Sequence, residues 1–150
     1  RFDHRRSDGK LDWRLDNLML DSNDPGRVVA VFDWDMCTVG DPLADLGTLL
    51  ASWAEAGEDF TGMAGRTPSA VPGFLTRREA VERYGRHRGV DVSQVPYYHV
   101  FGSFKMAVVL QQIYYRYYHR QTRTRRFGRF IWLIKYLEGY LERAIADARS

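Results

Sequence analysis

Hydrophobic positions along the chain change their spacing once, near residue 41. Before that point, the segments LDNLML (residues 15–20) and VVAVF (residues 28–32) flank the turn-rich segment SNDPG. Short β-branched runs bounded by turn residues are typical of buried strands. The sequence therefore predicts two short strands joined by a loop, with polar residues gathered at the strand ends.

From residue 41 onward, hydrophobic residues recur at the spacing of an α-helix. Asp41 suits the N-cap position, and Pro42 suits the first helical position. Gly57 is placed to end this helix. The residues that share its apolar face, and that we expect to pack inward, are Leu43, Leu46, Leu49, Leu50 and Trp53.

Three further helices are expected after a loop over residues 57–75, which is rich in Gly, Pro, Ser and Thr. Thr76 and Glu79 form the pattern of a capping box, which opens a short helix that Gly85 or Gly89 ends. A longer helix is predicted from about Ser93 or Pro96 to His119, and a last one from about Arg129 to Ala148. The expected buried positions are Phe101, Phe104, Val108 and Ile113 in the former, and Phe130, Leu133, Ile134, Leu137, Leu141 and Ile145 in the latter.

Composition is that of one globular domain, with 150 residues of which 45% are hydrophobic and 27% charged. Residues 1–10 are polar and show no period, so we expect an irregular N-terminal segment.

No apolar run approaches the roughly 20 residues that cross a bilayer, and no signal-peptide pattern is present, so no membrane partner is expected. The single Cys37 excludes an internal disulfide and favours a reducing, cytoplasmic compartment.

The net charge of +3 is unevenly distributed. Six arginines and one histidine lie between Arg116 and Arg129. Such a run is most often a solvated helix end and loop, but it can also attract phosphate, an acidic substrate or nucleic acid.

Polar residues near the predicted strands carry the strongest chemical signal. Asp12 and Asn17 are separated by four residues, and Asp33 directly follows the second strand. This D-x-x-x-x-N spacing occurs in kinase catalytic loops, although taken alone these residues would be explained as caps and turns of a hairpin. A carboxylate can orient a substrate hydroxyl and accept its proton, while amide and carboxylate oxygens suit magnesium.

The segments WRLDNLML and VVAVFDWDMCTVGDPLADLGTLL resemble the aminoglycoside phosphotransferase family, in particular the branch sometimes fused to acyl-CoA dehydrogenases. The segment YYHVFGSFKMAVVLQQIYYRYYHRQT is similar to the substrate-side helix of that branch, so the resemblance covers roughly residues 11–120. It implies an α+β, mostly helical fold: the C-terminal lobe of a protein-kinase-like enzyme, with a small strand pair and a helical bundle in a single domain.

The resemblance also implies roles for individual residues. Asp12 matches the catalytic base, and Arg14 stands where kinases commonly place a phosphate-contacting lysine. Asn17 and Asp33 match the two ligands of Mg²⁺. Asp45, in the segment GDPLADLG, matches an aspartate that we expect to brace the catalytic loop.

The implied reaction transfers the γ-phosphoryl group of ATP or GTP to a hydroxyl of a small molecule, with a hydroxylated acyl metabolite as the expected acceptor. Lys105 and Arg116 are candidates for lining the acceptor pocket. Two departures from the family pattern stand out. Lys10-Leu11 replaces the His-Gly that precedes the base, and no Gly-rich loop or strand lysine of an N-terminal lobe is present. We therefore expect the chain to be part of a longer product and inactive by itself.

Two other classes of function stay open. The chain could be a non-catalytic module that binds a metabolite or a protein, including a separate N-terminal lobe or a second copy through an apolar surface near the strands. It could also be a helical nucleic-acid binder that uses residues 114–129. We set nucleic acid aside as a partner because the carboxylates near Asp12 and Asp33 would repel phosphates in the absence of a metal.

Overall fold

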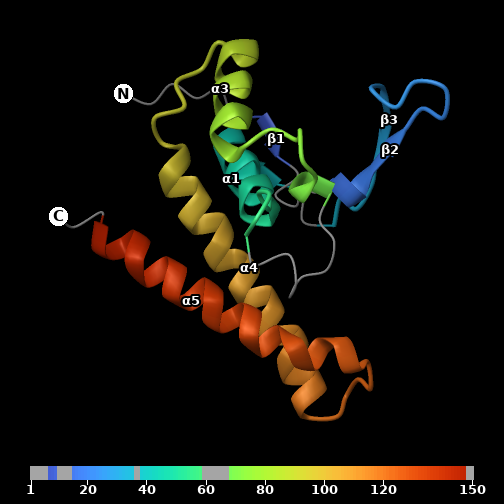
Figure 1. Cartoon of the computed structure of the whole chain (residues 1–150), viewed down its shortest axis with the longest axis vertical. Coiled ribbons are helices and arrows are strands. Elements are labelled where there is room, and N and C mark those ends of the chain that lie inside the picture. The colour runs from blue at the N-terminus through green and yellow to red at the C-terminus, as the bar shows by residue number, and fades with distance from the viewer. Residues whose placement is uncertain (1–6, 10–14, 36–37, 59–67, 148–150) are drawn as a thin grey trace.

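A computed structural model describes residues 7–9, 15–35, 38–58 and 68–147 of the chain. It is mostly helical, with two pairs of short strands beside the helices (Figure 1). The strands are β1 (Ser7–Gly9), β2 (Leu18–Leu20), β3 (Val28–Val31) and β4 (Thr38–Gly40); the α-helices are α1 (Pro42–Ser52), α3 (Arg77–Arg88), α4 (Val95–Tyr118) and α5 (Phe130–Asp147); and the 3-10 helices are η1 (Leu15–Asn17), η2 (Pro68–Ala70) and η3 (Arg125–Arg129).

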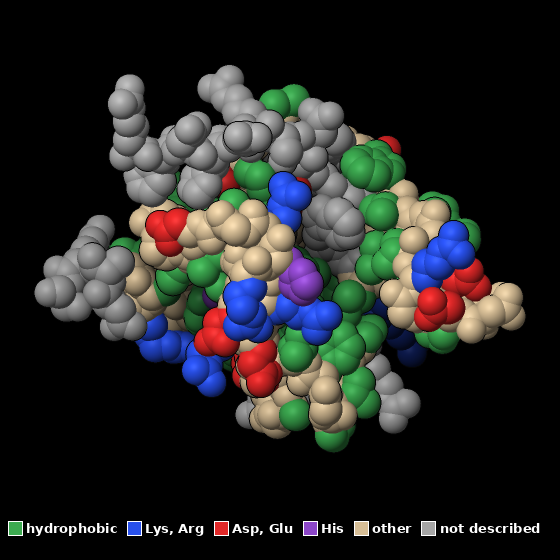
Figure 2. Space-filling view, turned by 90° about the horizontal axis from the view of Figure 1, so that it is seen from above, with side chains coloured by type: hydrophobic (Ala, Val, Ile, Leu, Met, Phe, Trp, Pro, Cys, Tyr) green, Lys and Arg blue, Asp and Glu red, His purple; other side chains and the backbone are tan. Residues whose placement is uncertain are grey.

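The predicted strand pair is confirmed as the antiparallel pair of β2 and β3, with Leu18 opposite Val31. Its burial was predicted wrongly. The large apolar residues along these strands and just after them are exposed: Met19, Leu20, Val28, Val29, Phe32 and Trp34. The pair projects from the helices as an arm, seen at the right of Figures 1 and 2, so its two faces are not enclosed between other elements. An exposed apolar surface near the strand pair, which the sequence predicted, is therefore present.

A second strand pair was not anticipated. Ser7–Gly9, within the segment expected to be irregular, pairs antiparallel with Thr38–Gly40. The sequence SDG has no strand-forming residues, and its partner lies about 30 positions away along the chain. Pairing of this kind depends on the tertiary fold and leaves no local period to detect.

Helix α1 begins as predicted. The carboxylate of Asp41 accepts a hydrogen bond from the backbone N–H of Leu43 (2.9 Å), and Pro42 is the first helical residue. Its inward face is also confirmed, because Leu46, Leu50 and Trp53 are buried. The helix ends at Ser52, earlier than Gly57 suggested. Leu43, Leu46 and Leu50 form one core cluster with Val95 of α4.

Small residues of α4 lie where this helix packs against α1. A Cβ atom on Gly102 would lie 2.6 Å from the carbonyl oxygen of Gly47, and Ser103 beside it is almost fully buried. Three of the predicted core positions of α4 are therefore wrong, since Phe101, Phe104 and Val108 are exposed. The fourth, Ile113, is half-buried.

Helix α5 packs along α4 and forms a second core cluster. Leu133 and Leu137 are buried there with Ala54, which confirms the central part of the predicted stripe. Ile145, near the end of the helix, is exposed, which corrects the prediction at that position. Helix α3 begins at the predicted capping box of Thr76 and Glu79 and ends at Gly89, which has a φ of 61°.

Candidate functional site

The register of β2 and β3 brings Asn17 and Asp33 to neighbouring positions. Asn17 is the residue before β2, and its carbonyl oxygen accepts a hydrogen bond from the backbone N–H of Phe32 (2.8 Å), which extends the pairing beyond Leu18 and Val31. Asp33 is the next residue after Phe32. Asn17 and Asp33 thus belong to the same end of the hairpin, one on each of its two chain segments.

Asp33 has an unusual backbone conformation. Its φ of 63° lies in the left-handed region, which non-glycine residues seldom adopt and in which aspartate is among the better tolerated. The indole N–H of Trp34 donates a hydrogen bond to the carbonyl oxygen of Val31 (2.8 Å), so the chain turns sharply around Asp33. Uncommon conformations of this kind occur at functional sites, where the surrounding structure holds them. No local pattern in the sequence predicts this conformation.

Of the other predicted site residues, only some lie within the described part of the chain. Asp12 and Arg14 lie outside the described residues, between β1 and η1. Asp45 is half-buried on α1, one turn after Asp41. Asp41 itself is tied to α4, because the hydroxyl of Tyr98 donates a hydrogen bond to its second carboxylate oxygen (2.8 Å). Burial first, and the Asp41 carboxylate second, raise the pKa of Tyr98 to about 12.

Lys105 and Arg116, the candidates for an acceptor pocket, lie eleven positions apart on α4, or about 16 Å along the helix axis. Arg116 lines a recess with a volume of about 360 Å³, and Lys105 is not part of its lining. The structure therefore does not bring these two cations together in one described cavity.

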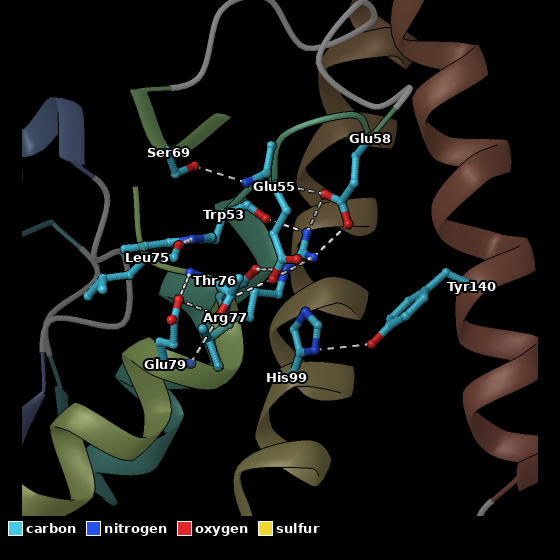
Figure 3. A network of polar contacts seen from close by, with 12 residues as sticks. Trp53, Glu55, Glu58, Ser69, Leu75, Thr76, Arg77, Glu79, His99 and Tyr140 are labelled. Atoms are coloured by element: carbon cyan, nitrogen blue, oxygen red, sulfur yellow. Dashed lines mark hydrogen bonds and ion pairs between the residues drawn. The ribbon is translucent and has the colours of Figure 1, made fainter. Parts of the chain in front are cut away.

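A polar network that the sequence did not reveal joins α1 and α3 (Figure 3). The guanidinium of Arg77 donates to both carboxylate oxygens of Glu58 (2.6 and 2.8 Å), and also to the carbonyl oxygens of Leu50 and Trp53 near the end of α1. Hydrogen bonding from Arg77 lowers the pKa of Glu58. These partners are 19 to 27 residues apart, so only the capping box beside Arg77 was visible as a local pattern.

Within the described part of the chain, no group of three or more His, Cys, Asp or Glu side chains could hold a metal. That result excludes a closed site of the zinc type among those residues. It is compatible with magnesium, which is commonly held by one or two carboxylates together with substrate phosphates and water. Over the same residues, no helix has the length and apolar character that crossing a membrane requires.

Comparison with solved structures shows which class of protein this fold belongs to. A crystal structure from Ralstonia eutropha JMP134, described as a candidate aminoglycoside phosphotransferase, superposes with a TM-score of 0.75 and 26% sequence identity. The match covers 94% of this chain and 43% of that protein. The fold is therefore that of a kinase-like phosphotransferase.

The chain belongs to the phosphotransferase enzyme family, whose pattern matches residues 11–88. Acyl-CoA dehydrogenase family member 11 is 34% identical over 112 residues in Pongo abelii and 33% identical over 111 residues in Homo sapiens. Family member 10 of Mus musculus is 32% identical over 109 residues. These matches cover 70–71% of this chain but only 10–14% of the relatives. The chain thus spans a small part of their length.

Proposed function

We propose that this domain supplies the acceptor and metal side of a small-molecule kinase, which transfers the γ-phosphoryl group of ATP or GTP to a hydroxyl. The observation that carries the proposal is the adjacency of Asn17 and Asp33 across the end of the β2–β3 hairpin. Membership of a phosphotransferase family supports the same reaction class.

In this proposal each side chain has one task. Asp12 orients the acceptor hydroxyl and accepts its proton, and Arg14 neutralises charge on the transferred phosphoryl group. Asn17 and Asp33 hold Mg²⁺ through an amide oxygen and a carboxylate oxygen, which are the hard ligands this ion prefers. When bound, the ion would supply positive charge that offsets the negative charge of the phosphates. Asp45 braces the segment that carries Asp12.

The acceptor that we propose is a hydroxylated acyl metabolite. Support comes from the relatives, which are named as members of the acyl-CoA dehydrogenase family and share this segment. A polycationic acceptor is disfavoured, because α4 contains no acidic residue and carries Lys105 and Arg116.

The test is phosphoryl transfer from labelled ATP to a panel of hydroxylated metabolites, measured with the 150-residue chain and with the complete gene product. Asp12→Asn and Asp33→Asn should each reduce turnover at least a hundredfold in any active form. Asp35→Asn is the matched control, because Asp35 is an exposed aspartate two residues from Asp33 and should leave turnover within twofold. Equal losses for Asp33→Asn and Asp35→Asn would contradict the assigned role of Asp33.

For the 150-residue chain alone we expect no detectable turnover. Kinases position the donor phosphates with a Gly-rich loop and a strand lysine, and the sequence contains neither. Because catalysis of this reaction rests on positioning, loss of the donor side should abolish it. A complete gene product that binds acceptors but transfers no phosphoryl group would favour a non-catalytic binding module instead.

A further inference from the structure

Charge is strongly separated along this chain. The 46 residues between Asp91 and Glu138 contain eight of the 22 lysines and arginines and none of the 19 acidic residues. The remaining 104 residues therefore hold 14 basic and 19 acidic residues. The modest net charge of +3 conceals a basic helical hairpin joined to an acidic remainder.

The fold concentrates most of this positive charge at one turn, between α4 and α5. We call residues Arg116–Arg129 the arginine turn. Its six cations are all exposed: Arg116, Arg120, Arg123, Arg125, Arg126 and Arg129. No ion pair involves any of the six among the described residues. A set of arginines whose charges are not neutralised nearby attracts anions, and the planar guanidinium suits phosphate in particular.

The backbone of the arginine turn is held in place by specific contacts. Arg120 has a φ of 57°, and the N–H of Gln121 donates a hydrogen bond to the carbonyl oxygen of Arg116 (2.8 Å). A Cβ atom on Gly128 would lie 2.9 Å from the ring of Tyr117, so η3 packs closely on the end of α4. These contacts hold the backbone segment that carries the exposed arginines.

A recess adjoins the arginine turn and shares Arg116 and Gln121 with it. Its volume is about 360 Å³, and its lining consists of Val108, Gln111, Gln112, Tyr115, Arg116 and Gln121. Three glutamine amides offer both donors and acceptors, the pattern that nucleobase edges match. Tyr115 is 57% exposed, so its ring offers an aromatic surface for stacking. The centroid of this ring lies 4.1 Å from that of His119.

The surface chemistry favours nucleic acid over a lipid membrane. Between residues 108 and 129 the large exposed hydrophobic residues are Val108, Val109, Tyr115 and Tyr118, so the aliphatic part of this surface is confined to two neighbouring valines. Binding to a membrane surface requires an apolar face that can be buried. Tyrosines interleaved with arginines are instead typical of surfaces that bind single-stranded nucleic acid.

The carboxylates near the strands, which would repel the phosphates of a nucleic acid, lie away from the arginine turn. Figure 1 shows the arginine turn at the lower end of the α4–α5 pair, whereas β2 and β3 form the arm that projects at the upper right. Asp33 and Asp35 are therefore remote from the arginine turn, and repulsion by their carboxylates does not act there.

We propose that the arginine turn and its recess bind single-stranded nucleic acid, separately from phosphoryl transfer. The arginines contact successive phosphates, and one base enters the recess and stacks on Tyr115. Six arginines spread over 14 residues exceed the needs of the few phosphates of a mononucleotide, which is why an extended strand is the occupant that fits.

The experiment measures fluorescence anisotropy of a labelled 12-nucleotide oligouridylate with the 150-residue chain, over a range of sodium chloride concentrations. If four phosphates are contacted, the slope of log K against log salt should be about −3. Arg123→Ala, Arg125→Ala and Arg126→Ala together should weaken binding at least tenfold and flatten this slope. The matched control removes three exposed arginines of α3 by Arg83→Ala, Arg86→Ala and Arg88→Ala, and should change affinity less than threefold.

Tyr115→Ala should weaken binding at least fivefold, and Tyr115→Phe should restore it because the ring is kept. Equal losses in the two triple variants would overturn the proposal, since net charge alone would then explain binding. Uridine monophosphate binding as tightly as the oligonucleotide would overturn it in favour of a small ligand. Tighter binding to phosphatidylserine vesicles than to the oligonucleotide would overturn it in favour of a membrane surface. Circular dichroism of each variant checks that the fold is intact.

Discussion

Replacing Gly102 by alanine should destabilise the protein, although alanine is the better helix former. The added Cβ would lie 2.6 Å from the carbonyl oxygen of Gly47, 2.8 Å from its carbonyl carbon and 2.9 Å from the Cα of Thr48. All three atoms belong to the backbone of α1, so no side chain can rotate away. The two helices would have to separate by somewhat less than 1 Å to reach ordinary contact distances.

The expected magnitude follows from two opposing effects. Overpacking in a close-packed interface costs typically 1–3 kcal/mol. The upper end applies here, since a shift of α4 also loosens the cluster of Leu43, Leu46, Leu50 and Val95. Alanine in place of glycine recovers up to about 1 kcal/mol of helix propensity. We therefore expect a net loss of about 2 kcal/mol in the free energy of unfolding.

Gly139→Ala is the matched control for this prediction. Gly139 also lies inside a helix, but the nearest atom to an added Cβ is the end of the flexible Arg143 side chain at 3.5 Å. This variant should gain about 0.5–1 kcal/mol. Urea unfolding followed by tryptophan fluorescence measures both changes through the transition midpoint. A Gly102→Ala variant as stable as Gly139→Ala would show that α1 and α4 are not in backbone contact.

Three further predictions concern the core and the polar networks. Leu46→Ala should cost on the order of 2–5 kcal/mol in urea unfolding, because Leu46 is buried between α1 and α4; a loss near zero would mean that this face is not in the core. Arg77→Lys should lower the free energy of unfolding by about 1–2 kcal/mol in thermal unfolding, since an ammonium cannot bridge both oxygens of Glu58 and also reach two carbonyls; an unchanged melting temperature would contradict it. Burial first, and the nearby Arg77 cation second, lower the pKa of His99 to about 4 from an ordinary value of 6.5. The unfolded state therefore binds more protons below pH 6.5, so the stability that His99 contributes at neutral pH should be lost as the pH falls from 6.5 toward 4. His99→Gln should make the free energy of unfolding depend less on pH over this range. The same pH dependence in the variant and in the unchanged protein would refute the assignment.

Elements whose signals are local could be predicted from the sequence. The start of α1 depends on Asp41 and Pro42, and the start of α3 on Thr76 and Glu79, which interact within three residues. The face that α4 buries could not be predicted, because close approach to α1 is decided by the absence of a side chain at Gly102. A pattern that weights hydrophobicity places Phe101 and Phe104 inside, although they are 42% and 56% exposed.

The candidate site divides in the same way. The strand pair that carries Asn17 and Asp33 could be predicted, since antiparallel pairing of two consecutive strands brings their outer ends together. The left-handed conformation of Asp33 could not be predicted, because it depends on how the chain turns after β3. The bonds of Arg77 to Glu58 and to the end of α1 are non-local. No sequence spacing marks Arg77 as different from the exposed arginines of the same helix.

Helix α1 connects the candidate site to the rest of the domain. At its start, Asp41 accepts a hydrogen bond from Tyr98 of α4. In its middle, Gly47 is in backbone contact with Gly102, and near its end Arg77 binds the carbonyl oxygens of Leu50 and Trp53. Strand β4 leads directly into this helix and pairs with β1, after which residues 10–14 follow. A change that displaces α1, even one remote from Asp12 and Asp33, should therefore reach the segment that carries the proposed base.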